Sequence, residues 1–154
     1  MIDQLFIAIR NADQAKVKEL ISADPQLVNQ ADARKFTPLI MATYMNQQAI
    51  AALLIEQGAN LEARDGKGNT AIMGVAFRGD LDMIELLIDK GAALNKQNYE
   101  GATALTYAID YGHLAIAKKL IEKGADLNTR DAKGKSPKDH ALQQENSAFL
   151  SLFE

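Results

Sequence analysis

Apolar and polar residues follow one another along the chain with the spacing of short amphipathic helices. Between residues 80 and 90 the apolar residues fall on one helical face: Leu81, Ile84, Leu87 and Ile88. A second stretch of helical pattern covers about residues 70–77, and Gly79 separates the two. Because glycine adopts the left-handed conformation that ends many helices, we predict two helices here, joined by a short turn.

The same pattern recurs every 33 residues. Four columns of equivalent positions share this spacing: a glycine column (Gly58, Gly91, Gly124), a hydroxyl column (Thr37, Thr70, Thr103, Ser136), an Asp/Asn column (Asp32, Asp65, Asn98, Asp131) and a leucine column (Leu61, Leu94, Leu127). A Ser or Thr oxygen can accept from the free N–H groups of a first helical turn, glycine can end a helix, and an Asp or Asn side chain can stabilise a turn. Each repeat is therefore predicted to be a turn followed by two helices.

A further glycine supports three of the predicted turns, at Gly68, Gly101 and Gly134. Glycine suits such a position because it has no Cβ to strain a left-handed backbone. Lys35 stands there in the first full repeat, so we expect that turn to have a different shape.

Two segments carry a recognisable core, and a third carries a closing motif. Residues 37–42 read Thr-Pro-Leu-Ile-Met-Ala, residues 103–108 read Thr-Ala-Leu-Thr-Tyr-Ala, and residues 124–128 read Gly-Ala-Asp-Leu-Asn. They resemble the ankyrin repeat, which has this period and a T-P-L-H-x-A core. Other residues replace the histidine of that core in every copy: Ile40, Met73, Thr106 and Asp139. The resemblance covers essentially the whole chain and implies an all-α solenoid, in which stacked helix-turn-helix repeats are joined by β-turn or hairpin loops.

We predict a single domain over residues 1–154, made of an N-terminal capping repeat (1–31), three full repeats (32–64, 65–97, 98–130) and a truncated C-terminal capping repeat (131–154). Lys16 in the first repeat takes the place of an apolar column (Ile50, Met83, Ile116), and Lys138 in the last takes the place of another (Leu39, Ile72, Leu105). Terminal repeats need a polar outer face because one side has no neighbour. Both ends are thus expected to be capped, as in a complete protein.

Composition narrows the class of protein. The 154 residues are 47% hydrophobic and 24% charged, close to the average for soluble globular proteins. A net charge of −3 argues against a polycation that coats nucleic acid, and the lack of cysteine excludes disulfides and thiolate chemistry. No stretch approaches the roughly 20 apolar residues of a membrane span, and the start of the chain lacks the features of a secretory signal. We therefore expect a cytoplasmic monomer that binds neither nucleic acid nor membrane.

Candidate catalytic groups are few. His113 and His140 are the chain's two histidines, and we interpret both as structural residues of the repeat. Gly134-Lys135-Ser136 is similar to the end of a phosphate-binding loop, but Thr129 stands where that motif requires glycine. We predict no enzyme, no metal and no cofactor.

The resemblance implies a concave partner-binding surface, formed by the turn tips and the outer edges of the first helices. The residues expected on it are Arg34, Phe36, Tyr44, Met45, Lys67, Phe77, Arg78, Tyr99, Asp110 and Tyr111. They include five of the chain's nine aromatic residues, and aromatic, Met and Arg side chains are enriched at protein interfaces. We predict a protein–protein interaction module with Tyr44, Phe77 and Tyr111 at its centre. Arg78 and Asp110 are expected to orient the partner.

Three alternatives remain open at this point. The chain resembles the small stand-alone ankyrin proteins with irregular repeats that bacteria keep as inhibitors or immunity-type regulators of one protein. An enzymatic or ligand-binding groove would use Asp110 and the nearby tyrosines, whereas an architectural scaffold would self-associate or carry several partner sites. A basic group near the last turn (Arg130, Lys133, Lys135, Lys138) is interpreted as a solvated cap, with an acidic partner as the alternative.

Overall fold

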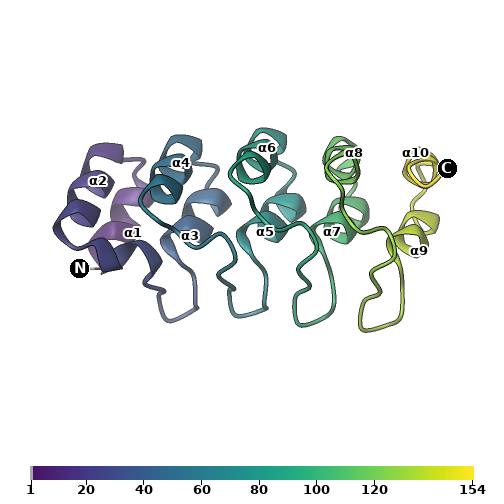
Figure 1. Ribbon diagram of the computed structural model, residues 1–154, viewed down its shortest axis with the longest axis horizontal. Helices are drawn as coiled ribbons and strands as arrows, with labels where there is room; N and C mark the ends of the chain where they lie inside the picture. The colour runs from purple at the N-terminus through teal and green to yellow at the C-terminus, as the bar shows by residue number, and fades with distance from the viewer. Residues whose placement is uncertain (1) are drawn as a thin grey trace.

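The computed structural model describes residues 2–154, which form helices connected by turns (Figure 1). They contain ten α-helices and one 3₁₀ helix: α1 (Ile2–Arg10), α2 (Gln14–Ala23), η1 (Pro25–Asn29), α3 (Pro38–Tyr44), α4 (Gln48–Glu56), α5 (Ala71–Arg78), α6 (Leu81–Asp89), α7 (Ala104–Asp110), α8 (Leu114–Glu122), α9 (Pro137–Leu142) and α10 (Ala148–Ser151). The predicted helices at about 70–77 and 80–90 correspond to α5 and α6. The all-α prediction is confirmed.

Consecutive helices form antiparallel pairs that stack side by side in two rows (Figure 1). Helices α1, α3, α5, α7 and α9 contact one another in the first row, and α2, α4, α6 and α8 contact one another in the second. Long turns between the pairs project to the same side of the stack (Figure 1). This is the predicted solenoid of helix-turn-helix units.

The core lies between the two rows and between neighbouring pairs. Ile50, Met83 and Ile116, one residue from each of three successive pairs, are at most 2% exposed. Such residues gain about 1.5–3 kcal/mol each from removal of their side chains from water. At the two ends of the stack, Lys138 is exposed and Lys16 is half-buried.

Side-chain hydroxyls cap three of the first-row helices. Thr37, Thr103 and Ser136 each accept a hydrogen bond from a backbone N–H of the following turn, at 3.2, 3.3 and 3.2 Å. At Thr70 no such bond forms, and the buried hydroxyl has no hydrogen-bond partner among residues 2–154. The capping prediction is therefore confirmed at three positions and wrong at Thr70.

The four projecting turns share one geometry. In the turn that contains Lys35, the Asp32 N–H donates to the Phe36 carbonyl at 2.9 Å, as Asp65 N–H donates to Asn69 at 2.9 Å in the next turn. Lys35 has φ +66°, close to the +81° of Gly68. The expectation of a differently shaped turn is wrong, because lysine adopts the left-handed conformation that glycine adopts elsewhere.

Candidate protein-binding groove

A groove of about 600 Å³ runs between the turn tips and helices α3, α5 and α7. Seven of the ten residues that the sequence places on the concave surface line it: Arg34, Phe36, Tyr44, Lys67, Phe77, Tyr99 and Tyr111. Tyr99 is 68% exposed, Tyr44 and Tyr111 are 52% exposed, and Phe77 is 46% exposed. The groove thus brings together four large aromatic side chains that remain in contact with water.

The aromatic rings of α5 and α7 contact one another. The Phe77 and Tyr111 ring centroids are 4.4 Å apart at an angle of 64°, an edge-on packing. Tyr107 lies 6.1 Å from Phe77 and 6.0 Å from Tyr111. Rings in such arrangements attract one another beyond the area that they bury, so this cluster forms a firm wall of the groove.

Sequence reasoning missed Tyr107, which ties this wall to two turn tips. Its hydroxyl accepts a hydrogen bond from Asn98 Nδ2 at 2.8 Å and donates to Asn69 Oδ1 at 3.3 Å, while Asn98 Nδ2 also donates to Asn69 Oδ1 at 2.9 Å. Burial and the nearby charge of Glu100 raise the pKa of Tyr107 above its ordinary value, against the effect of its Asn69 hydrogen bond. The phenol therefore stays neutral and holds the tips in place.

Gly74 was missed as well, and it opens the floor of the groove. It lies in α5 and lines the groove, and an added Cβ would meet nothing within 4 Å. The equivalent positions in the neighbouring first-row helices hold Met41 and Tyr107. Because Gly74 has no side chain, the space beside Phe77 stays open.

His113 supports Phe77 from the next helix pair. Its Nε2 lies 3.0 Å from the Phe77 carbonyl oxygen, and because a carbonyl only accepts, the ring nitrogen donates. The imidazole also covers Gly79, where an added Cβ would come within 2.5 Å of the ring. The interpretation of His113 as structural fits these contacts, although they reach beyond its own turn.

Three predicted residues lie outside the lining of the groove. Met45 is 37% exposed and follows the end of α3. The Arg78 guanidinium lies 4.9 Å from the Tyr44 ring centroid, and its Nε is 3.5 Å from Asp80 Oδ2. Arg78 thus packs on the ring of a groove residue, Tyr44, without lining the groove itself.

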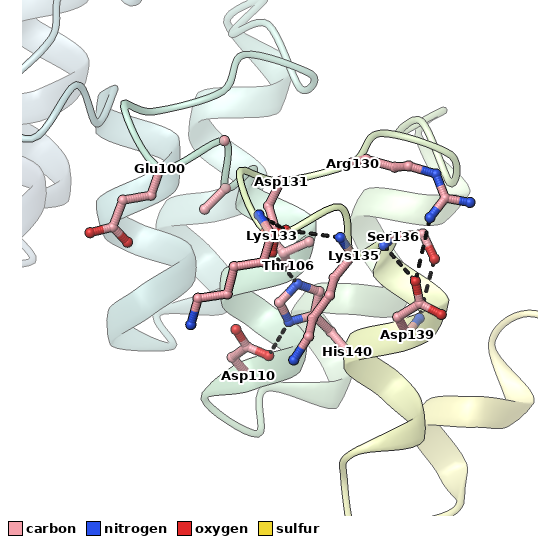
Figure 2. A network of polar contacts seen from close by, with 12 residues as sticks. Glu100, Thr106, Asp110, Arg130, Asp131, Lys133, Lys135, Ser136, Asp139 and His140 are labelled. Atoms are coloured by element: carbon pink, nitrogen blue, oxygen red, sulfur yellow. Dashed lines mark hydrogen bonds and ion pairs between the residues drawn. The ribbon is translucent and has the colours of Figure 1, made fainter.

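Asp110, the third of these residues, bonds to a histidine from the last helix pair (Figure 2). Its Oδ1 lies 2.8 Å from His140 Nδ1, and His140 Nε2 lies 2.8 Å from Asp131 Oδ2. Because carboxylate oxygens accept and do not donate, both bonds require a doubly protonated, positively charged imidazole. The His140 cluster (Asp110, Asp131 and His140) therefore joins α7, the last turn and α9, and a contact between Asp110 and a partner would compete with it.

Hydrogen bonds stabilise the charged form of Asp131. Partial burial acts to raise its pKa, but the backbone N–H of Lys135, the His140 ring and the backbone N–H of Lys133 outweigh it, and the pKa falls below its ordinary value of 3.8. A depressed pKa means that the carboxylate stabilises the fold above about pH 3.8 and ceases to do so as the pH falls through the lower folded-state value.

Asp131→Asn is expected to lower the free energy of unfolding by about 1–3 kcal/mol near pH 6, the usual contribution of hydrogen bonds to a charged group. The difference from wild type should shrink as the pH falls from 3.8 through the lower folded-state pKa, since the Asp131 carboxylate is then protonated as well. Urea unfolding at a series of pH values tests this, with Glu56→Gln as an exposed control outside the cluster. A difference in the free energy of unfolding that stays constant down to about pH 2 would contradict this role of the Asp131 carboxylate.

Within residues 2–154, no group of three or more His, Asp and Glu side chains is placed to hold a metal ion. In the same part of the chain, no helix is both long enough and apolar enough to cross a membrane.

Comparison with known proteins gives two family matches that together run from residue 34 to residue 131. Residues 61–131 match a description of ankyrin repeats in three copies, and residues 34–66 match a single ankyrin repeat. Among curated proteins, Ankyrin repeat and SAM domain-containing protein 6 of Rattus norvegicus is 34% identical over 81 residues, and so is that of Mus musculus. Each match covers 52% of this chain and 9% of the relative. The chain thus matches less than a tenth of the length of these relatives.

Proposed function

Because the chain belongs to the ankyrin repeat family, whose repeats generally mediate protein–protein interaction, we propose that it is a non-enzymatic module that binds one partner protein through the groove. The proposal rests on the position of the chain's exposed aromatic residues. Of the seven large hydrophobic side chains that are exposed within residues 2–154, the groove holds four: Tyr44, Phe77, Tyr99 and Tyr111. Contiguous exposed apolar surface of this kind marks binding sites.

The groove is preorganised, which supports tight binding from few contacts. The Tyr107 hydrogen bonds fix two turn tips against α7, and His113 holds the Phe77 backbone. A surface that is already ordered loses little conformational entropy when a partner docks. Phe77 and Tyr111 can then act as anchors of the kind that dominate binding energy.

The gathering of exposed aromatics in one groove favours a single partner over a scaffold with several sites. An inhibitor or immunity-type regulator of one bacterial protein is the narrower form of this proposal. An enzymatic groove is less well supported, because its candidate acid, Asp110, bonds to His140.

Site-specific photo-crosslinking tests the proposal in cells. A benzoylphenylalanine at position 99, the most exposed aromatic of the groove, is expected to crosslink one partner protein reproducibly. The same probe at Leu142 serves as the control, since this side chain is 59% exposed and lies outside the groove lining. Equal crosslinking from both positions, or none from position 99, would count against the groove.

A further inference from the structure

Two arginines of the chain already stack on aromatic rings of the groove. The Arg34 guanidinium lies 4.7 Å from the Phe36 ring centroid, and that of Arg78 lies 4.9 Å from the Tyr44 ring centroid. Each is also close to a carboxylate, Arg34 at 3.4 Å from Asp32 and Arg78 at 3.5 Å from Asp80. Both of these combinations of an aromatic ring and a carboxylate thus include an arginine of the protein itself.

The pattern changes towards α7. Tyr111 follows Arg78 by one repeat period and takes its place, so that a ring rather than a guanidinium packs on the preceding aromatic, Phe77, at 4.4 Å. At the turn tips the charge also changes sign, from Arg34 and Lys67 to Glu100. The α7 half of the groove therefore offers aromatic rings and a carboxylate without an arginine of its own.

The Glu100 carboxylate is available to a ligand. The side chain is exposed and forms no ion pair within residues 2–154, and only its backbone is tied, through Asn98 Oδ1 at 3.0 Å and through the Ala132 N–H at 3.0 Å. The lysines on the two adjacent turn tips are Lys67 and Lys133, and neither is paired with it; Lys133 is drawn beside it in Figure 2. The charge of Glu100 also reaches the aromatic wall, because it helps to raise the pKa of Tyr107 after the larger effect of burial.

Tyr99 and Tyr111 contribute exposed rings to the groove that Glu100 also lines. Tyr99 is 68% exposed, and one side of its ring covers Gly68, where an added Cβ would lie 2.8 Å from a ring carbon. Both tyrosines line the same groove as Glu100.

The geometry points to a subsite in the α7 half of the groove that binds an arginine side chain of the partner protein, stacked on Tyr99 or Tyr111 and paired with Glu100. This inference rests on the proposed function and names the chemistry that the groove selects. A guanidinium is planar, so it can stack on a ring while two parallel N–H groups reach a carboxylate. Lysine lacks this geometry. Arg34 repels a second cation at the other end of the groove, which fixes the direction of the bound segment.

Selection of random 12-residue peptides on phage tests the subsite. The wild-type protein is expected to enrich peptides with arginine at one fixed position, and Glu100→Gln is expected to lose that enrichment. For a selected peptide, Glu100→Gln should weaken binding roughly tenfold, as should exchange of the peptide arginine for citrulline, its neutral analogue. Exchange for lysine should also weaken binding, and Lys133→Gln should strengthen it by removing a competing cation. Glu56→Gln, an exposed carboxylate on α4, should change nothing.

The outcomes separate this inference from the proposed function. Peptides that lack a fixed arginine, or that bind Glu100→Gln as tightly as wild type, overturn the subsite while the groove remains the binding surface. Peptides that bind equally well to a Tyr44→Ala, Phe77→Ala, Tyr111→Ala variant overturn the groove as well. Failure of the wild-type protein to enrich any peptide over Glu100→Gln also overturns the subsite.

Discussion

Replacement of Gly101 by alanine is expected to lower the free energy of unfolding by about 3 kcal/mol or more. The residue has φ +79°, where a Cβ is strained by about 1–2 kcal/mol. An added Cβ would also lie 2.8 Å from Ala132 N and 2.8 Å from the Cα of Asp131. Both are backbone atoms of the next turn, so relief requires the turn to move and stretches the 3.0 Å hydrogen bond from Ala132 N–H to the Glu100 carbonyl.

Gly134 provides a matched control for this prediction. It holds the same place in the following turn, with φ +77°, but an added Cβ there meets nothing within 4 Å. Gly134→Ala should therefore lose only the contribution of backbone strain, about 1–2 kcal/mol. Urea unfolding of both variants gives their losses in free energy of unfolding. The difference between the two losses reports the contribution of the contact between neighbouring turns. Equal losses would show that this contact contributes nothing to stability.

The arrangement of helices could be predicted because its signals are local and repeated. Gly79, with φ +93°, ends α5 where the sequence places the break. The period of 33 residues then assigns equivalent positions across the chain. Lys35 shows the limit of such reasoning, since residue type alone gives the wrong turn shape when the surrounding bonds hold a lysine in the left-handed conformation.

The candidate groove was predicted less completely, because its details depend on contacts between repeats. The repeat period makes Tyr44 and Phe77 equivalent and places Tyr111 one residue after the next equivalent position, and all three line the groove. Tyr107 falls inside the core motif, where a side chain is expected to be buried, and nothing local indicates its bonds to two turn tips. Asp110 bonds to a histidine 30 residues away in the sequence. One usable signal was present in the sequence: Gly74 stands at a position where the adjacent repeats have the large residues Met41 and Tyr107.

Replacement of Gly74 by tyrosine is expected to weaken partner binding about 100-fold, the effect of losing a central anchoring contact. The new side chain would fill the floor of the groove beside Phe77 while every exposed aromatic residue and turn tip stays in place. The fold should accept it, because an added Cβ meets nothing within 4 Å and Tyr107 occupies the equivalent position of α7. Gly74→Ala is the matched control: it keeps the space open and should stabilise α5 by about 0.5–1 kcal/mol.

The affinity of these variants for the protein crosslinked through position 99, measured by isothermal titration calorimetry, tests most directly whether the groove is the binding surface. We expect wild type and Gly74→Ala to bind with affinities within about twofold of each other. Gly74→Tyr should unfold at the same urea concentration as wild type or a higher one and should lose about 100-fold in affinity. Equal affinity of Gly74→Tyr and wild type would contradict the groove as the site of partner binding.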